Sequence, residues 1–251
     1  MAQQESFITL NGTLGKLTFY RSKEGFLVRQ KGGVSAQRMA SDPAFQRTRE
    51  NGAEFGRAGI AGKLLRNALR ALLQNASDSK MVGRLTREMV KVIQADITNP
   101  RGLRNVIDGE AGLLEGFEFN IGGKLLTTMY APFTASITRA SGELVVSIPP
   151  FVPLNMITAP EGATHFRINS AGVEIDFEQA AYTVAVNSSA TISWDSTVTE
   201  ALKLTNTVTA NSTHPLFLAL GIEFFQQVNA TMYPLKNVAF NALSLVKVSG
   251  L

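Results

Sequence analysis

Residues 43–62, PAFQRTRENGAEFGRAGIAG, open like a helix and carry four glycines within eleven residues, and the strongly helical KLLRNALRALL follows at 63–73. Asp42 before Pro43 predicts the helix start, with aspartate as the N-cap and proline at the first helical position. Glycine inside a helix costs roughly 1 kcal/mol relative to alanine. Four glycines in this helix therefore indicate a requirement that outweighs helix stability.

The predicted helix is apolar on two faces. One face follows a spacing of three and four residues and consists of Phe55, Ala58, Gly62, Leu65, Leu69 and Leu72. The nearly opposite face carries Ile60, Leu64 and Ala71, and a basic ridge of Lys63, Arg66 and Arg70 lies between the two. One partner helix covers only one of these faces, so the second face requires the sheet or another subunit.

The glycines of this helix form a surface of small residues. Gly52 and Gly56 make a G-x-x-x-G step, which Gly59, Ala61 and Gly62 extend, and such a surface lets another backbone approach closely. Three interpretations stay open: packing against the chain's own N-terminal strands, contact with another subunit, or a hinge. For the subunit contact, the expected interface residues are Gly52, Phe55, Gly56, Ile60, Leu64, Arg66 and Arg70.

The rest of the first 104 residues predicts a small β-meander and a second helix. ESFITL, KLTFYR and FLVRQ within residues 5–30 alternate and are separated by turn-forming residues. After QNASDS at 74–79, residues 80–97 repeat the helical spacing with Val82, Leu85, Met89 and Val92. Two helices joined by a short polar segment predict an antiparallel αα-hairpin.

From residue 131 the apolar residues recur every second position. Residues 133–151 predict a hairpin that turns at Ser141 and Gly142, and further alternating segments follow up to VAFNALSLVKVSG at 238–250. Seven or more short strands predict an immunoglobulin-like β-sandwich. The expected fold class is α+β, with a basic meander and hairpin at 1–104, a connector at 105–130 and the sandwich at 131–251.

Composition restricts the chemistry and the location. The chain of 251 residues has 45% apolar content and no cysteine, so it can bury a core but forms no disulfide. The longest apolar run, LFLALGI at 216–222, is too short for a membrane helix, so no membrane insertion is expected. MAQQESFITL lacks the features of a secretory signal. The expectation is synthesis in the cytoplasm, with a virion or other released assembly as a further location.

Catalytic signatures are missing from the sequence. The two histidines, His165 and His214, occur in no metal-binding or nucleophile motif, and no phosphate-binding glycine loop is found. We therefore expect no enzymatic activity, cofactor or metal. Glu174, Asp176 and Glu178 alternate along one strand face, where they are expected to be solvated. Calcium binding and contact with the basic half of another copy are the alternatives for these carboxylates.

Charge is distributed unevenly along the chain. Residues 1–104 hold 18 Lys and Arg against 8 Asp and Glu, and residues 105–251 hold 6 against 12. Basic side chains on the predicted hairpin can neutralise phosphates without reading sequence. The candidates for such nonspecific nucleic-acid contact are Arg47, Arg49, Arg57, Lys63, Arg84, Arg87 and Lys91.

The N-terminal segment carries a recognisable combination of residues, namely Gly12, Gly15, Leu17, Phe19, Gly25, Val28, Arg29, Pro43, Gln46 and Arg49. This combination resembles the opening of uncharacterised bacterial and prophage-encoded proteins, over about the first 60 residues. Some of those proteins look like virion or assembly components. The spacer after Gly33 departs from their pattern because it lacks a proline ahead of Asp42 and Pro43. The resemblance implies a role in assembly.

Together these features predict a non-enzymatic structural protein that self-assembles in many copies into a shell, tube, fibre or lattice. The doubly apolar helix, the oppositely charged halves and the last predicted strand, expected to pair across a subunit edge, favour this function. A nonspecific nucleic-acid-binding protein is the alternative. A glycan or cell-surface binding module is a second alternative, which rests on fold analogy.

Overall fold

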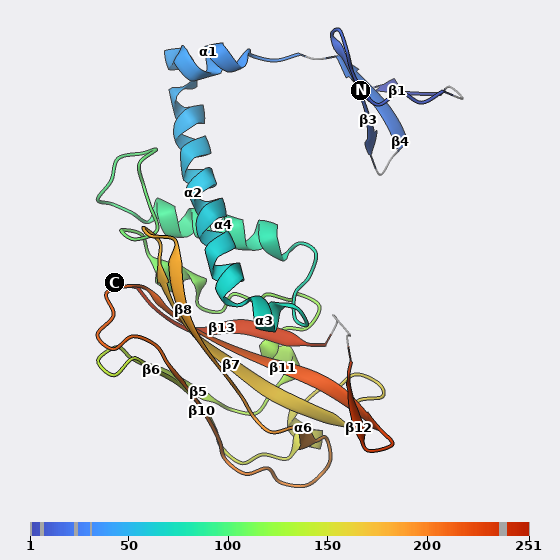
Figure 1. Cartoon of the computed structure of the whole chain (residues 1–251), viewed down its shortest axis with the longest axis vertical. Coiled ribbons are helices and arrows are strands. Elements are labelled where there is room, and N and C mark those ends of the chain that lie inside the picture. Colours follow the sequence, from blue (N-terminus) through green and yellow to red (C-terminus); the bar gives the residue numbers. More distant parts are fainter. Residues whose placement is uncertain (1, 6–7, 23–24, 31, 236–239, 251) are drawn as a thin grey trace. The chain divides into compact units, whose positions relative to one another are not determined.

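The computed structural model describes residues 2–5, 8–22, 25–30, 32–235 and 240–250 (Figure 1). The chain divides into two compact units, Met1–Arg49 and Glu50–Leu251. Its fold is α+β with antiparallel sheets. The boundaries expected at 104 and 131 both fall inside the second unit, because the helices after residue 50 share a core with the following strands.

The first unit contains a four-stranded antiparallel sheet. Its strands are β1 (Ala2–Gln3), β2 (Gly12–Leu14), β3 (Leu17–Ser22) and β4 (Gly25–Gln30), in the order β1-β4-β3-β2. The strands predicted from KLTFYR and FLVRQ are confirmed as β3 and β4. The strand predicted at 5–10 falls partly on residues 6–7, outside the described residues, and its described residues 8–10 are not in a strand.

Helix α1 (Ala36–Ser41) and the 3-10 helix η1 (Pro43–Phe45) follow this sheet. The Asp42 cap is confirmed: its Oδ1 accepts a hydrogen bond from the Ala44 backbone N–H at 2.9 Å, with Pro43 at the first helical position. Helix α1 was not predicted from the sequence. Its N-cap is Ser35, whose hydroxyl accepts from the Arg38 N–H at 3.2 Å.

Helix α2 (Gln46–Ala68) begins in the first unit and continues into the second, which also contains α3 (Arg70–Leu73) and α4 (Met81–Gln94). Helix α4 crosses α2 rather than lying alongside it in Figure 1, so the antiparallel hairpin is not confirmed. At the crossing, a Cβ on Gly62 would lie 3.6 Å from the Leu85 side chain. This glycine therefore allows close packing of α2 on α4.

The strands of the second unit form two antiparallel sheets. The smaller sheet contains β5 (Thr134–Thr138), β6 (Glu143–Ile148) and β10 (Leu202–Thr207), in the order β10-β6-β5. The larger sheet contains β7 (His165–Asp176), β8 (Ala181–Ser188), β9 (Ile192–Ser193), β11 (Leu216–Val228), β12 (Thr231–Pro234) and β13 (Ala242–Ser249). Along the chain, the short helices η2 (Ala111–Leu114) and α5 (Leu125–Thr128) lie between α4 and β5, and α6 (Pro153–Met156) lies between β6 and β7.

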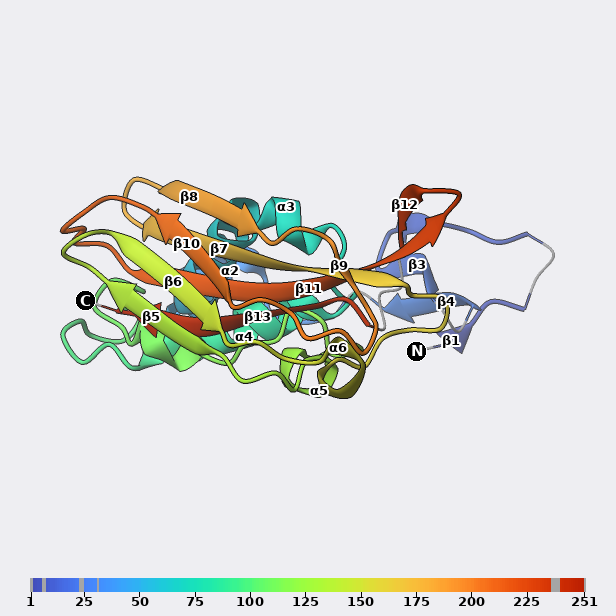
Figure 2. The same ribbon diagram turned by 90° about the horizontal axis from the view of Figure 1, so that it is seen from below.

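The larger sheet lies between two cores. Alternate residues such as Val173 and Phe217 pack with the helices, whereas Ile168 and Leu218 pack with the smaller sheet. Figure 2 shows the helices and the smaller sheet on opposite faces of the larger sheet. Burial on both faces explains why LFLALGI is apolar throughout. The predicted immunoglobulin-like sandwich is not confirmed, because the helices add a third layer.

The segment expected as a connector, 105–130, belongs to this fold. Gly116 N–H donates to the Leu245 carbonyl at 2.7 Å, and Phe119 N–H donates to the Leu243 carbonyl at 2.9 Å. The outer edge of β13 is therefore covered by the chain itself. The expectation that the last strand offers a free edge for another subunit is wrong for this reason; its first residues, 238–239, lie outside the described residues.

Candidate interaction surface

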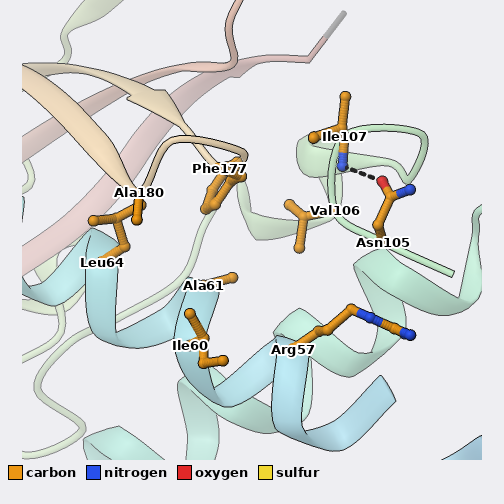
Figure 3. Close-up of a pocket in the computed structure, with 9 residues that line it drawn as sticks. All are labelled: Arg57, Ile60, Ala61, Leu64, Asn105, Val106, Ile107, Phe177 and Ala180. Carbon is orange, nitrogen blue, oxygen red and sulfur yellow. Dashed lines mark hydrogen bonds between the residues drawn. The ribbon is translucent and has the colours of Figure 1, made fainter. Parts of the chain in front are cut away.

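An apolar groove of about 220 Å³ lies between α2, the loop at 105–107 and the turn after β7 (Figure 3). We call it the α2 groove. Its lining residues are Arg57, Ile60, Ala61, Leu64, Asn105, Val106, Ile107, Phe177 and Ala180. Phe177 and Ala180 face the α2 side chains across the hollow in Figure 3. The groove is thus built from three segments that are distant in sequence.

The loop that forms one wall is fixed by buried polar groups. Asp96 accepts hydrogen bonds from the N–H groups of Thr98, Asn99 and Asn105 at 2.8, 2.9 and 3.1 Å, and from Asn99 Nδ2 at 2.9 Å. Burial alone raises the pKa of Asp96, but these hydrogen bonds outweigh it and lower the pKa to about 2. The carboxylate therefore remains charged while it orders the loop.

Helix α2 holds the same loop from the other side. The buried Glu54 carboxylate accepts from the Gly102 N–H at 2.8 Å. Arg57 donates to the Arg104 carbonyl at 2.7 Å and also to the Gly102 carbonyl. Charge-assisted bonds of this kind are stronger than neutral ones. Arg57, predicted as a nucleic-acid contact, is thus engaged with the backbone of its own chain.

Next to the groove, α2 has a largely exposed face. Phe55 is 61% exposed and Ile60 is 65% exposed. At 100° per residue, Gly52, Gly56 and Gly59 lie between them on the helix surface. A Cβ on any of these three glycines would meet nothing within 4 Å. We call these five residues the exposed α2 face. Phe55 was expected on the face that packs on a partner helix, and this expectation is wrong because its side chain is mostly exposed.

The structure separates the expected interface residues. Leu64 is buried at 8% exposure against the groove, whereas Ile60 stands at its rim. Arg66 is half-buried and Arg70 is exposed on the following turns. Of the second apolar face that the sequence predicted, Leu64 is thus covered by the fold itself and Ile60 remains exposed.

An apolar row on β8 extends this region and was missed from the sequence. Tyr182, Val184 and Val186 are 43%, 38% and 50% exposed. Their partners on β7 are Ile175, Val173 and Ala171, which belong to the helix-facing core, so the row points to the helix side of the sheet. The turn that leads into β8 lines the α2 groove. The signal was the alternation in YTVAV, but alternation alone does not distinguish a covered face from an open one.

The basic residues predicted to contact nucleic acid do not form one free track. Arg84 donates to the Glu118 carbonyl at 2.6 Å and ion-pairs with Asp78. Arg49 donates to the carbonyls of Met39 and Asp42, and Arg87 and Lys91 pair with Glu88. Arg47 and Lys63 are exposed. The structure therefore uses several of these cations to bind its own backbone and carboxylates.

The three alternating carboxylates have different environments: Glu178 is exposed and Asp176 is half-buried, as expected of a solvated face, whereas Glu174 is enclosed. Glu174 is buried and accepts from Ser212 Oγ at 2.5 Å and from the Thr209 N–H at 3.2 Å. Burial raises its pKa, but these hydrogen bonds outweigh that effect and lower it. The prediction of a solvated face is wrong for Glu174, because the 209–214 loop covers it. Within the described ranges, no group of three His, Asp or Glu side chains is placed to hold a metal ion.

A second cavity, of about 320 Å³, lies beside Glu118 and Arg84. Both Glu118 carboxylate oxygens are 3.2 Å from the Leu125 N–H, at the start of α5. Burial raises the pKa of Glu118 to about 7, against the opposing effects of Leu125, Lys124 and Arg84. This carboxyl joins the 117–119 segment to α5, a structural role that accounts for its position.

The sequence matches no protein-family model and no curated protein, and the structure matches no solved structure. In the part of the chain that the structure describes, no helix combines the length and apolar character needed to cross a membrane.

Proposed function

We propose that this chain is a structural subunit that associates with further copies of itself through the exposed α2 face. The observation that carries the proposal is the open glycine surface flanked by Phe55 and Ile60, both more than 60% exposed. Three helix-interior glycines cost stability, yet a Cβ on any of them would meet none of the described residues within 4 Å. Close approach of another backbone is the use that such a surface fits.

The first unit supports the proposal independently. None of its described residues is buried. Leu14, Leu17, Phe19, Phe26 and Val28 occupy one face of its sheet, because their registers place them on the same side. A small sheet without a buried side chain has no core of its own. In the proposed assembly, contact with a further copy covers this apolar face of the first unit as well.

The uneven charge favours contacts between unlike parts of neighbouring copies. The basic residues are concentrated before residue 105 and the acidic ones after it. Head-to-tail contacts between unlike surfaces extend into rings or filaments, depending on whether the rotation closes. We therefore propose an assembly of many copies, of the kind found in virion-like shells, tubes or lattices.

Sedimentation velocity and negative-stain electron microscopy of the purified chain test this proposal. The Ile60→Arg variant places a charge on the exposed α2 face and is expected to lower the sedimenting mass. Val82→Arg is the matched control, because Val82 is an exposed β-branched residue on another helix. Equal particle size for both variants and the unmodified chain contradicts the α2 contact. Particles that contain nucleic acid and dissolve with nuclease favour nucleic-acid binding instead.

A further inference from the structure

Strand β8 has an open edge. It is the last strand of the larger sheet on the β7 side, and Figure 2 shows it at the border of that sheet. Among the described residues, β8 forms its strand ladder with β7 alone. Strand β10 packs near β8, and Asn187 Nδ2 donates to the Thr205 carbonyl of β10 at 3.1 Å. That bond lies near the end of the strand. In the described part of the chain, the backbone groups of residues 181–186 form no backbone hydrogen bond outside the β7 ladder, so the outward-facing groups are available for pairing.

The usual protection of sheet edges is missing from β8. Natural edge strands carry lysine, proline or bulges that prevent pairing with another chain. Residues 179–194 contain no charged residue and no proline, and the β7–β8 register runs without a shift from Asp176 to Asn169. Three other border strands differ: β10 carries the exposed Lys203, β12 contains Pro234, and the 115–119 segment covers β13.

The row on β8 is self-complementary. When two β8 strands pair antiparallel about Val184, Tyr182 lies opposite the partner subunit's Val186, and the two Val184 side chains lie opposite each other. All six side chains then fall on one face of a continuous sheet. A neutral strand meets its own copy without like-charge repulsion. A register shifted by one residue would place the two apolar rows on opposite faces of the joined sheet, so that they no longer contact each other.

We propose that β8 pairs antiparallel with β8 of a second copy, so that two larger sheets join across a twofold axis. This inference rests on the proposed self-assembly and names one of its contacts. A twofold contact closes at a dimer. Extension into a larger assembly then requires a second contact, which the exposed α2 face provides. The unit of assembly is therefore a β8-linked dimer.

The test uses the full-length Ile60→Arg chain, in which the α2 contact is broken. Sedimentation velocity is expected to give a dimer, about twice the 27.1 kDa chain mass. Adding either Val184→Lys or Val184→Glu places like charges opposite each other and is expected to give monomers. An equimolar mixture of these two double variants is expected to return to the dimer mass. Ser136→Lys, on the exposed surface of β5, is the matched control that leaves the dimer intact.

Two results overturn β8 pairing: an Ile60→Arg chain that is already monomeric, or charge variants at Val184 that stay dimeric or fail to associate when mixed. Circular dichroism of each variant checks that it is folded. A dimer that re-forms in the mixture is a second check, because only folded chains can pair.

The two proposals can be refuted independently of each other. If Ile60→Arg gives monomers from a large particle, the α2 contact stands and β8 pairing is refuted. If the unmodified chain is a dimer that only Val184 variants dissociate, β8 pairing stands and the α2 contact is refuted.

Discussion

Replacing Gly56 with alanine is expected to change chain stability and assembly in opposite directions. Gly56 lies inside α2, and a Cβ built on it meets nothing within 4 Å. The added methyl group therefore creates no clash, and it removes the helix penalty of glycine, so the free energy of unfolding rises by about 0.5–1 kcal/mol. The same holds for Gly52 and Gly59. For a unit of this size, each kcal/mol raises Tm by about 2–4 °C.

Assembly is expected to respond in the other direction. At a close helix contact, each added methyl group keeps the neighbouring backbone away, so the triple alanine variant is expected to sediment at a lower mass than the unmodified chain. Stability is measured by urea unfolding in the Ile60→Arg background, where the α2 contact does not contribute. Gly172→Ala is the control for a glycine needed inside the fold, because its Cβ would lie 2.8 Å from Asn206 Cβ.

Two outcomes refute this reasoning. If the triple alanine variant lowers the free energy of unfolding in the Ile60→Arg background, the glycines serve packing within the chain. If it raises stability and leaves the particles unchanged, the glycines are not at a close contact. The expected result is a higher free energy of unfolding together with a lower sedimenting mass.

Three further predictions concern the groups that hold the second unit together. Asp96→Ala leaves backbone N–H groups without their acceptor and is expected to lower the free energy of unfolding by about 3 kcal/mol in urea titrations. Because folding lowers the pKa of Asp96 to about 2, the carboxylate stabilises the fold above pH 4, and this stabilisation is lost as pH falls towards 2. Glu118, with its pKa raised to about 7, favours the folded state below pH 4.5 and loses this contribution as pH rises to 7. Glu118→Gln is therefore expected to be more stable than the unmodified chain at pH 8, by about 1–2 kcal/mol after allowance for solvent screening, and equally stable at pH 4. If the difference in free energy of unfolding between the variant and the unmodified chain is the same at both pH values, the raised pKa of Glu118 is contradicted. Arg57→Leu is expected to lower the free energy of unfolding by about 2 kcal/mol through the lost bonds to 102 and 104, and a variant as stable as the unmodified chain contradicts this role.

Local patterns predicted many elements of this fold. Alternation and turn residues predicted β3, β4 and the β5–β6 hairpin, and the cap at Asp42 is confirmed. The three- and four-residue spacing identified Leu65 of α2 and Leu69, the residue after α2, as core residues. These features depend on residues that are close together in the sequence, so the sequence alone is enough to predict them.

The arrangement of layers could not be predicted in the same way. Strand β11 is buried on both faces, and an apolar run does not show whether a helix or a sheet covers each face. The segment at 115–119 follows β13 mainly through backbone hydrogen bonds, which leave no periodic signal. Glu174 has the spacing of a solvated residue, and only the distant Ser212 and Thr209 show that it is buried.

Sedimentation velocity of the unmodified chain at moderate salt tests the central claim most directly. Self-association predicts a mass far above 27.1 kDa that persists as salt rises and falls when Ile60 is replaced by arginine. A monodisperse species of 27.1 kDa over the whole concentration range contradicts the claim, because Phe55 and Ile60 then remain solvated without a partner copy.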